Sequence, residues 1–155
     1  KTVPFTLKGE NMKKLLSLMV ISLLISGSAF ADYCRSSYQI SNRADDVAFQ
    51  TRTLAQEIRY EFGEIRLLED VRRVRQAAKH LARLARSGGY RCHVLKSNFA
   101  SLSRVNYTLR QNFSSFSRRR DVRRVAYEWR NFVDTFESLR RTVQMARDRQ
   151  GYPYP

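Results

Sequence analysis

The chain has 155 residues, and its 29 Lys and Arg residues outnumber its 14 Asp and Glu residues, which gives a formal net charge of +15. This length supplies one hydrophobic core and is too short for two. Cysteine occurs twice, with no CxxC or CxxCH sequence. That usage argues against a zinc knuckle, a thioredoxin-like redox pair and covalently attached haem.

Residues 12–31 are predicted to form a cleavable secretory signal peptide. Met12 is followed by two lysines, residues 15–25 are apolar except for two serines, and Ala29 and Ala31 are the small residues that signal peptidase requires. The apolar run is shorter than the about 20 residues of a spanning helix. We therefore expect export to the periplasm or the extracellular space, with no transmembrane segment in the mature chain.

The signal peptide divides the rest of the chain. Residues 1–11 precede its start, and we expect them to be a translated leader that is not part of the native protein. Residues 32–150 are predicted to be a single helical domain. Residues 151–155, Gly-Tyr-Pro-Tyr-Pro, end the last helix and are predicted to be a flexible tail.

Cys34 and Cys92 are predicted to form a disulfide. Two cysteines in an exported, oxidising setting are most simply one bridge. It would close a loop of nearly sixty residues, which the chain-entropy model values at about 4 kcal/mol. Antiparallel helices would bring the start of the first helix beside the start of the third, where these two residues lie.

The fold class predicted from the apolar spacing is all-α. Apolar residues recur at three- and four-residue intervals, and no run alternates with period two. Short connections favour an antiparallel up-down four-helix bundle with left-handed packing. The expected helices are 41–62, 66–87, 91–116 and 120–148.

Each predicted helix has its own apolar seam. The last is the most regular, running from Val122 to Ala146, and the third runs from Cys92 to Phe116 with Asn106 as a buried polar member. The first helix has the weakest seam. Phenylalanines and the single tryptophan in these seams are expected to be core residues, whereas Tyr107 and Tyr127 fall outside them.

Two features of the helical region stay open at this level. If Gly63 does not break the chain, the first two helices merge into one. The sequence Asp-Val-Arg-Arg-Val occurs at residues 70–74 and again at 121–125. That 51-residue offset indicates either a duplicated helical hairpin or a chance recurrence in an Arg-rich chain.

Charge is distributed very unevenly along the chain. Residues 32–70 hold eight acids and five bases, whereas residues 71–120 hold thirteen bases and no acid. Five of these bases follow one another by three or four residues and so form one line on the second helix, called here the basic ridge. Its residues are Arg72, Arg75, Lys79, Arg83 and Arg86. A second basic cluster follows the third helix, namely Arg118, Arg119 and Arg120.

The last helix differs from the second in its charges. Opposite charges are spaced by four residues in the pairs Arg124–Glu128, Arg130–Asp134 and Glu137–Arg141, the spacing of intrahelical ion pairs. The five bases of the basic ridge have no acid between them, and like charges at this spacing cost stability. The ridge is therefore interpreted as a site for an anionic partner, with a merely solvated surface as the alternative.

Enzymatic chemistry is not indicated. There is no nucleophile elbow, Walker loop or Rossmann glycine set, and the carboxylates lie where salt bridging accounts for them. His80 and His93 lack the ligand number and spacing of a metal or haem site. We expect no catalytic residue, no cofactor and no metal.

The sequence favours an exported, non-enzymatic protein that binds an anionic envelope component through a basic face on the second and third helices. Candidate partners are lipid headgroups, an anionic envelope polymer, an acidic protein or the acidic first helix of another copy. One alternative is a periplasmic chaperone-like or protein-interaction bundle. Nucleic-acid binding is the second alternative, which the charge allows and export argues against.

Overall fold

The computed structural model describes residues 34–118 and 121–147, which belong to one compact unit, Asp32–Pro155. The predicted leader (1–11), the predicted signal peptide (12–31) and the predicted tail (151–155) lie outside the described residues. Within the described part, every regular element is a helix.

Four helices form, as the apolar spacing predicts. They are α2 (Ser37–Glu61), α3 (Ile65–Arg86), α4 (Cys92–Ser117) and α5 (Arg123–Met145). Gly63, with φ of 61°, and Gly88, with φ of 70°, follow the ends of α2 and α3. This left-handed conformation favours glycine and stops a helix, so α2 and α3 are separate helices.

Two predicted boundaries are wrong by a few residues. The first helix begins at Ser37 rather than at residue 41, because the Ser37 N–H donates to the Cys34 carbonyl (3.0 Å) and the disulfide fixes Cys34. The last helix is shorter at both ends than the predicted 120–148. The spacing of apolar residues cannot predict a helix start that depends on a disulfide to a distant residue.

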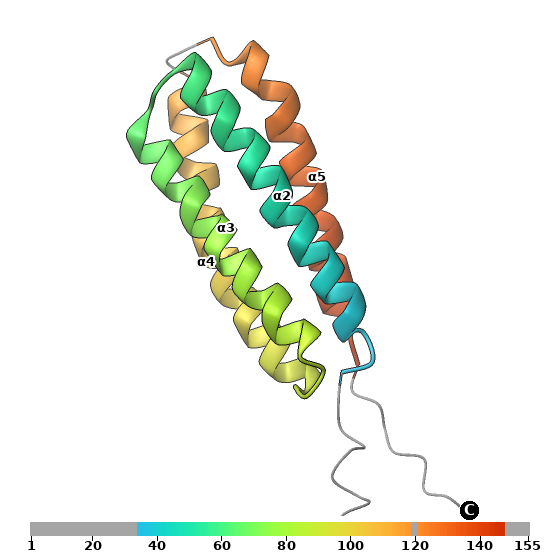
Figure 1. Cartoon of the computed structure of the whole chain (residues 1–155). Helices are drawn as coiled ribbons and strands as arrows, with labels where there is room; N and C mark the ends of the chain where they lie inside the picture. Colours follow the sequence, from blue (N-terminus) through green and yellow to red (C-terminus); the bar gives the residue numbers. More distant parts are fainter. Residues whose placement is uncertain (1–33, 119–120, 148–155) are drawn as a thin grey trace, which may run out of the picture. The chain divides into compact units, whose positions relative to one another are not determined.

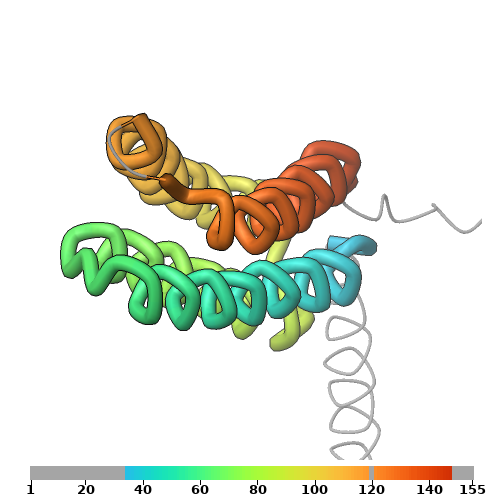
Figure 2. The backbone as a smooth tube through the Cα atoms, turned by 90° about the horizontal axis from the view of Figure 1, so that it is seen from above, coloured from blue at the N-terminus to red at the C-terminus, as the bar shows by residue number. Residues whose placement is uncertain are grey.

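The helices run alternately up and down, which confirms the predicted antiparallel four-helix bundle (Figure 1). Seen from above, α2 and α3 lie in one layer and α4 and α5 in the other (Figure 2). Across the layers, α2 packs against α5 and α3 packs against α4.

The core follows the predicted seams. Leu67, Val71, Val74, Ala78, Leu81 and Ala85 of α3 are all buried, as are most seam residues of α4 and α5. Val122, Phe116 and Trp129 are only half-buried. In α2 the predicted seam misses four buried side chains, listed here: Ile40, Ser41, Val47 and Leu54.

Polar groups in the core are few and mostly bonded. Asp70 is 5% exposed and accepts a hydrogen bond from the Asn112 amide at 2.6 Å. The Ser41 hydroxyl donates to the Ala82 carbonyl at 3.2 Å. Asn106 is buried as predicted, but its side-chain oxygen has no partner. These bonds connect α3 to both of its neighbours, because Asn112 lies on α4 and Ser41 on α2.

The predicted Cys34–Cys92 disulfide is present, with the Cα atoms 4.7 Å apart. Both cysteines are almost completely buried, and the Cys34 N–H donates to the Tyr90 carbonyl at 3.1 Å. The bridge joins the residue before α2 to the first residue of α4, so it connects the two layers at one end of the bundle.

The two Asp-Val-Arg-Arg-Val sequences do not occupy equivalent positions. Asp70 lies inside α3 and is buried, whereas Asp121 precedes α5 and is exposed. The fold therefore gives no support to a duplicated hairpin with this offset.

Candidate anion-binding surface

The basic ridge lies on the side of α3 that faces α2. Arg72 and Arg75 line a groove between these two helices, and Arg86, at the other end of the ridge, pairs with Asp45 of α2. Lys79 and Arg83 lie between them at helical spacing and are exposed. The ridge of the predicted basic face therefore borders α2.

The α2–α3 groove has a volume of about 490 Å³ and contains three arginines. Arg59 reaches it from α2, and Arg72 and Arg75 reach it from α3. Its other lining residues are mostly apolar or small, namely Thr51, Ala55, Ile65, Leu68, Glu69 and Val71. The groove thus combines several guanidinium groups with an apolar floor.

Few carboxylates neutralise this surface. Glu69 is the groove's acid, and its carboxylate is held by Arg73 at 3.0 Å. Asp45 pairs with Arg86, so this member of the ridge has an acidic partner that the charge pattern along α3 could not reveal. Arg72, Arg75, Lys79 and Arg83 form no ion pair with a carboxylate of the described residues.

Arg75 is the ridge residue that is partly withdrawn from solvent. Its side chain is half-buried, and its Nε atom is buried without a hydrogen-bond partner among the described groups. Buried donors are nearly always paired in folded proteins. Arg75 is less exposed than the other members of the ridge.

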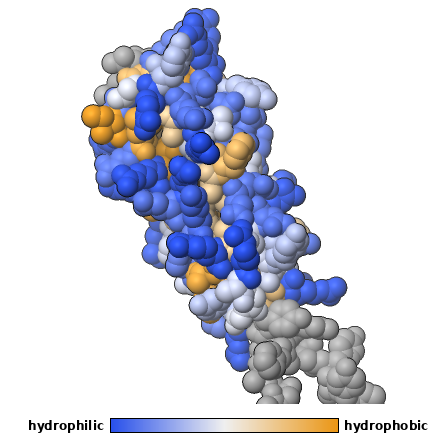
Figure 3. Space-filling view, viewed as in Figure 1, coloured by the Kyte–Doolittle hydropathy of each residue, from blue (hydrophilic) through white to orange (hydrophobic). Residues whose placement is uncertain are grey.

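The surface over α2 and α3 is largely hydrophilic (Figure 3). Apolar residues appear on it as separate small patches between the charged ones. We call this surface the α2–α3 face and define its basic residues as Arg52 and Arg59 of α2 together with the basic ridge of α3.

The second predicted basic cluster is only partly described. Arg118 is exposed and follows the last residue of α4, and it does not line the α2–α3 groove. Arg119 and Arg120 lie outside the described residues. The candidate surface therefore consists mainly of ridge residues, namely Arg72, Arg75, Lys79 and Arg83. Arg52 and Arg59 of α2 also belong to it, and the charge pattern of the second predicted helix could not include them.

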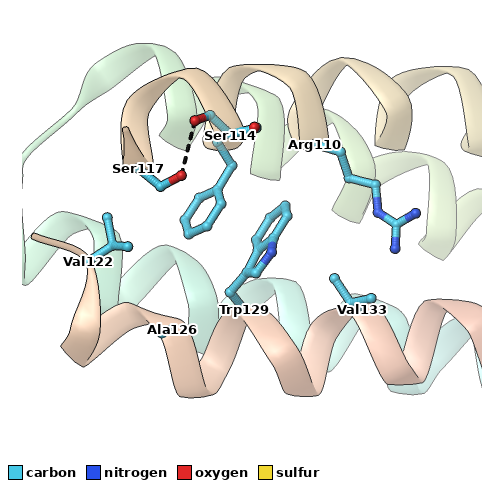
Figure 4. Close-up of a pocket in the computed structure, with 8 residues that line it drawn as sticks. Arg110, Ser114, Ser117, Val122, Ala126, Trp129 and Val133 are labelled. Carbon is cyan, nitrogen blue, oxygen red and sulfur yellow. Dashed lines mark hydrogen bonds between the residues drawn. The ribbon is translucent and has the colours of Figure 1, made fainter. Parts of the chain in front are cut away.

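A second groove, of about 530 Å³, lies between α4 and α5 (Figure 4). The rings of Phe113 and Trp129 stack across it, with centroids 3.8 Å apart and planes at 11°. Arg110 lines the groove, but its guanidinium group lies 3.5 Å from the Glu137 carboxylate. This groove is therefore aromatic and carries a neutralised cation, unlike the α2–α3 groove.

The chain matches no protein-family model, no curated protein and no solved structure. Function is therefore inferred from the residues of this chain.

The charged residues of α5 pair differently from the prediction. None of the three predicted four-residue pairs forms an ion pair in the described structure. Instead Arg124 reaches Glu61 of α2 at 3.0 Å, and Glu137 contacts Arg140 as well as Arg110. The Glu61 carboxylate raises the pKa of Arg124, chiefly through their hydrogen bond. Arg124 thus pairs with an acid of α2, whereas Glu137 pairs both within α5 and with α4.

The start of α5 is held by its own preceding residue. The Asp121 carboxylate accepts the Arg123 backbone N–H at 3.0 Å and the Arg123 guanidinium at 2.6 Å. The side-chain and backbone hydrogen bonds from Arg123 hold the pKa of Asp121 below its ordinary value. Arg123 is therefore engaged by this acid and is not available to an external anion.

Other kinds of site were sought in the part of the chain that the structure describes. No three His, Cys, Asp or Glu side chains come together there as metal ligands would. His80 and His93 are both exposed. The described helices include none with the length and apolar character needed to cross a membrane.

Proposed function

We propose that this protein is a non-enzymatic, exported binding protein that attaches to an anionic component of the cell envelope through the α2–α3 face. The observation that carries the proposal is the set of arginines in the α2–α3 groove. Arg59, Arg72 and Arg75 line one groove, and none of them pairs with a described carboxylate. Guanidinium groups bind phosphate and carboxylate oxygens in a planar, two-point geometry.

The energetic cost of this arrangement supports a binding role. Like charges at three- and four-residue spacing destabilise a helix by a few tenths of a kcal/mol per pair. Elsewhere in the bundle, Glu61 and Glu137 hold arginines across helices. In the ridge only Arg86 has such a partner, Asp45, and the other four members form no ion pair with a described carboxylate.

Export of the protein remains part of the proposal. The Cys34–Cys92 bridge supports it, because stable disulfides form in oxidising compartments. In such a compartment the abundant anions include lipid phosphates and anionic envelope polymers, and nucleic acid is scarce.

The test compares two triple variants that remove the same charge from different places. One replaces Arg72, Arg75 and Lys79 with Gln. The matched control replaces Arg104, Arg130 and Arg141, which are exposed and without an ion pair among the described residues. Binding to polyphosphate and to vesicles containing phosphatidylglycerol is measured at low and high salt.

We expect binding of the unaltered protein to weaken as salt increases, because salt screens exposed charges. Each basic residue near an anionic surface contributes about 1 kcal/mol, so the ridge variant should bind about 100-fold more weakly. The control variant should lose much less. Equal losses in both variants would show that net charge, and not the α2–α3 face, governs binding. Binding that persists at high salt would favour the chaperone-like alternative.

A further inference from the structure

Three exposed aromatic residues form a row along α2. Tyr38, Phe49 and Tyr60 are 75%, 64% and 82% exposed and follow one another by eleven residues. Eleven residues make about three helical turns, so the rings lie in one line and about 16 Å apart. Single exposed apolar residues are common on protein surfaces, but a straight row of three rings along one helix is not accounted for by packing.

This aromatic row belongs to the α2–α3 face. Asp45 lies one helical turn before Phe49, and its carboxylate holds Arg86 of the ridge. Tyr60 continues the line of Phe49 along α2, eleven residues further on. Because α2 and α3 are neighbours in one layer of the bundle (Figure 2), and Asp45 of α2 holds Arg86 of α3, the ridge comes close to the aromatic row near Phe49.

Ile65 extends the apolar part of this face. It begins α3, lines the α2–α3 groove and is 80% exposed. The carboxylates closest to the ridge are already engaged, Asp45 by Arg86 and Glu69 by Arg73. An anionic surface approaching this face would therefore meet arginines and exposed apolar side chains with little acidic repulsion.

We infer that the partner is the surface of an anionic lipid bilayer, on which the α2–α3 face lies flat with Tyr38, Phe49 and Tyr60 among the headgroups. This inference rests on the proposed function and identifies its partner. Interfacial helices combine basic side chains, which bind lipid phosphates, with aromatic side chains, which enter the headgroup region. Basic side chains near an anionic leaflet are attracted to it electrostatically.

The spacing of the rings separates a bilayer from other anions. A soluble polyanion would use the arginines and leave the aromatic row in water. Single-stranded nucleic acid stacks its bases on aromatic rings, but rings about 16 Å apart cannot serve successive bases. A bilayer surface has no such spacing requirement and can take all three rings together.

The experiment uses the unit Asp32–Pro155, which contains the whole described core. One variant replaces Tyr38, Phe49 and Tyr60 with Ser. The control replaces two exposed aromatics outside this face, Tyr107 on α4 and Tyr127 on α5, with Ser. Binding is measured to phosphatidylglycerol-containing vesicles, to polyphosphate and to single-stranded DNA, and circular dichroism checks that each variant is helical.

We expect the aromatic-row variant to bind vesicles at least ten-fold more weakly and polyphosphate within two-fold of the unaltered protein, while the control changes neither. Unchanged vesicle binding by the aromatic-row variant would overturn the bilayer inference and leave the proposed function standing. Tighter binding of DNA than of vesicles would also overturn it. If the Arg72, Arg75 and Lys79 variant binds every anion as well as the unaltered protein, the proposed function itself fails.

A second readout follows insertion directly. Phe49→Trp in a Trp129→Phe background places the protein's single tryptophan on the aromatic row. Lipids with brominated acyl chains should quench its fluorescence, and soluble polyphosphate should not. Fluorescence that brominated vesicles leave unchanged, although the protein is bound, would contradict insertion.

Discussion

The two layers of the bundle are built from different side chains. Between α2 and α3 small residues meet at one point, where the Ser41 hydroxyl donates to the Ala82 carbonyl at 3.2 Å. Between α4 and α5 the contacts are aromatic, as in the stacked Phe113–Trp129 pair and the Phe99–Phe136 pair with centroids 5.8 Å apart. Accordingly α2 and α3 pack more closely than α4 and α5.

The layers also differ in how their surface charges are satisfied. In the α4–α5 layer some arginines meet acids, such as Arg110 with Glu137 and Arg124 with Glu61, whereas Arg104, Arg130 and Arg141 form no ion pair among the described residues. Most of the basic ridge on α3 meets none among the described residues. The closely packed α2–α3 layer therefore carries the line of unpaired basic residues on which the candidate binding face is built.

The largest expected loss of stability comes from removing the covalent link between the layers. Replacing Cys34 and Cys92 with Ala removes the bridge between the start of α2 and the start of α4. The chain-entropy model predicts a loss of about 4 kcal/mol in the free energy of unfolding. Chemical denaturation of the variant measures it. A variant as stable as the unaltered protein would show that helix packing alone holds the layers together.

A matched pair of substitutions tests the difference in packing. Ala82→Leu enlarges a side chain that is 1% exposed in the close α2–α3 contact, and we expect a loss of about 1–3 kcal/mol. Ala126→Leu makes the same change beside the α4–α5 groove of about 530 Å³, where space is available. Its unfolding free energy should not fall. Similar losses in both variants would contradict the described difference between layers.

The charge difference predicts opposite signs at two exposed positions. Arg83→Gln relieves repulsion in the basic ridge and should raise the free energy of unfolding by a few tenths of a kcal/mol. Arg124→Gln removes the partner of Glu61 and should lower it slightly. Both are measured by urea denaturation at low salt. Loss of stability in Arg83→Gln would argue that the ridge is structural.

The smallest effect concerns the start of α5. Hydrogen bonds from Arg123 lower the pKa of Asp121, so its carboxylate contributes stability above the ordinary aspartate pKa of about 3.9. That contribution is lost as pH falls through the lowered folded-state pKa. Asp121→Asn should therefore melt slightly below the unaltered protein at pH 7, and the difference should shrink on acidification. A difference that grows at low pH would contradict this assignment.

Helix positions were largely predictable because the apolar spacing is regular and glycines end two helices. Gly63 and Gly88 take the left-handed conformation that breaks a helix. The seam predicted for α2 did not include Leu54 and Val47. Small residues lie among the apolar ones in this helix, so its helical periodicity is weak. The start of α2 depends on Cys34, a tertiary anchor that local pattern does not contain.

The composition of the candidate surface was only half predictable. Spacing along α3 places Arg72 and Arg75 on one side of that helix, but it cannot say which neighbour lies on that side. Which helix lies on that side depends on whether the four helices follow one another clockwise or anticlockwise around the bundle. Arg59 and the Asp45 partner of Arg86 belong to another helix, so no pattern within α3 could indicate them.

The disulfide gives the α2–α3 face a further property. The Cys34–Cys92 bridge closes a covalent ring that contains the whole of α2 and α3. These two helices carry the aromatic row and the basic ridge. Ordering a flexible binding segment normally weakens association, and constraining it beforehand strengthens it. The bridge restricts this part of the chain before any partner binds, and so contributes to the preorganisation of the face.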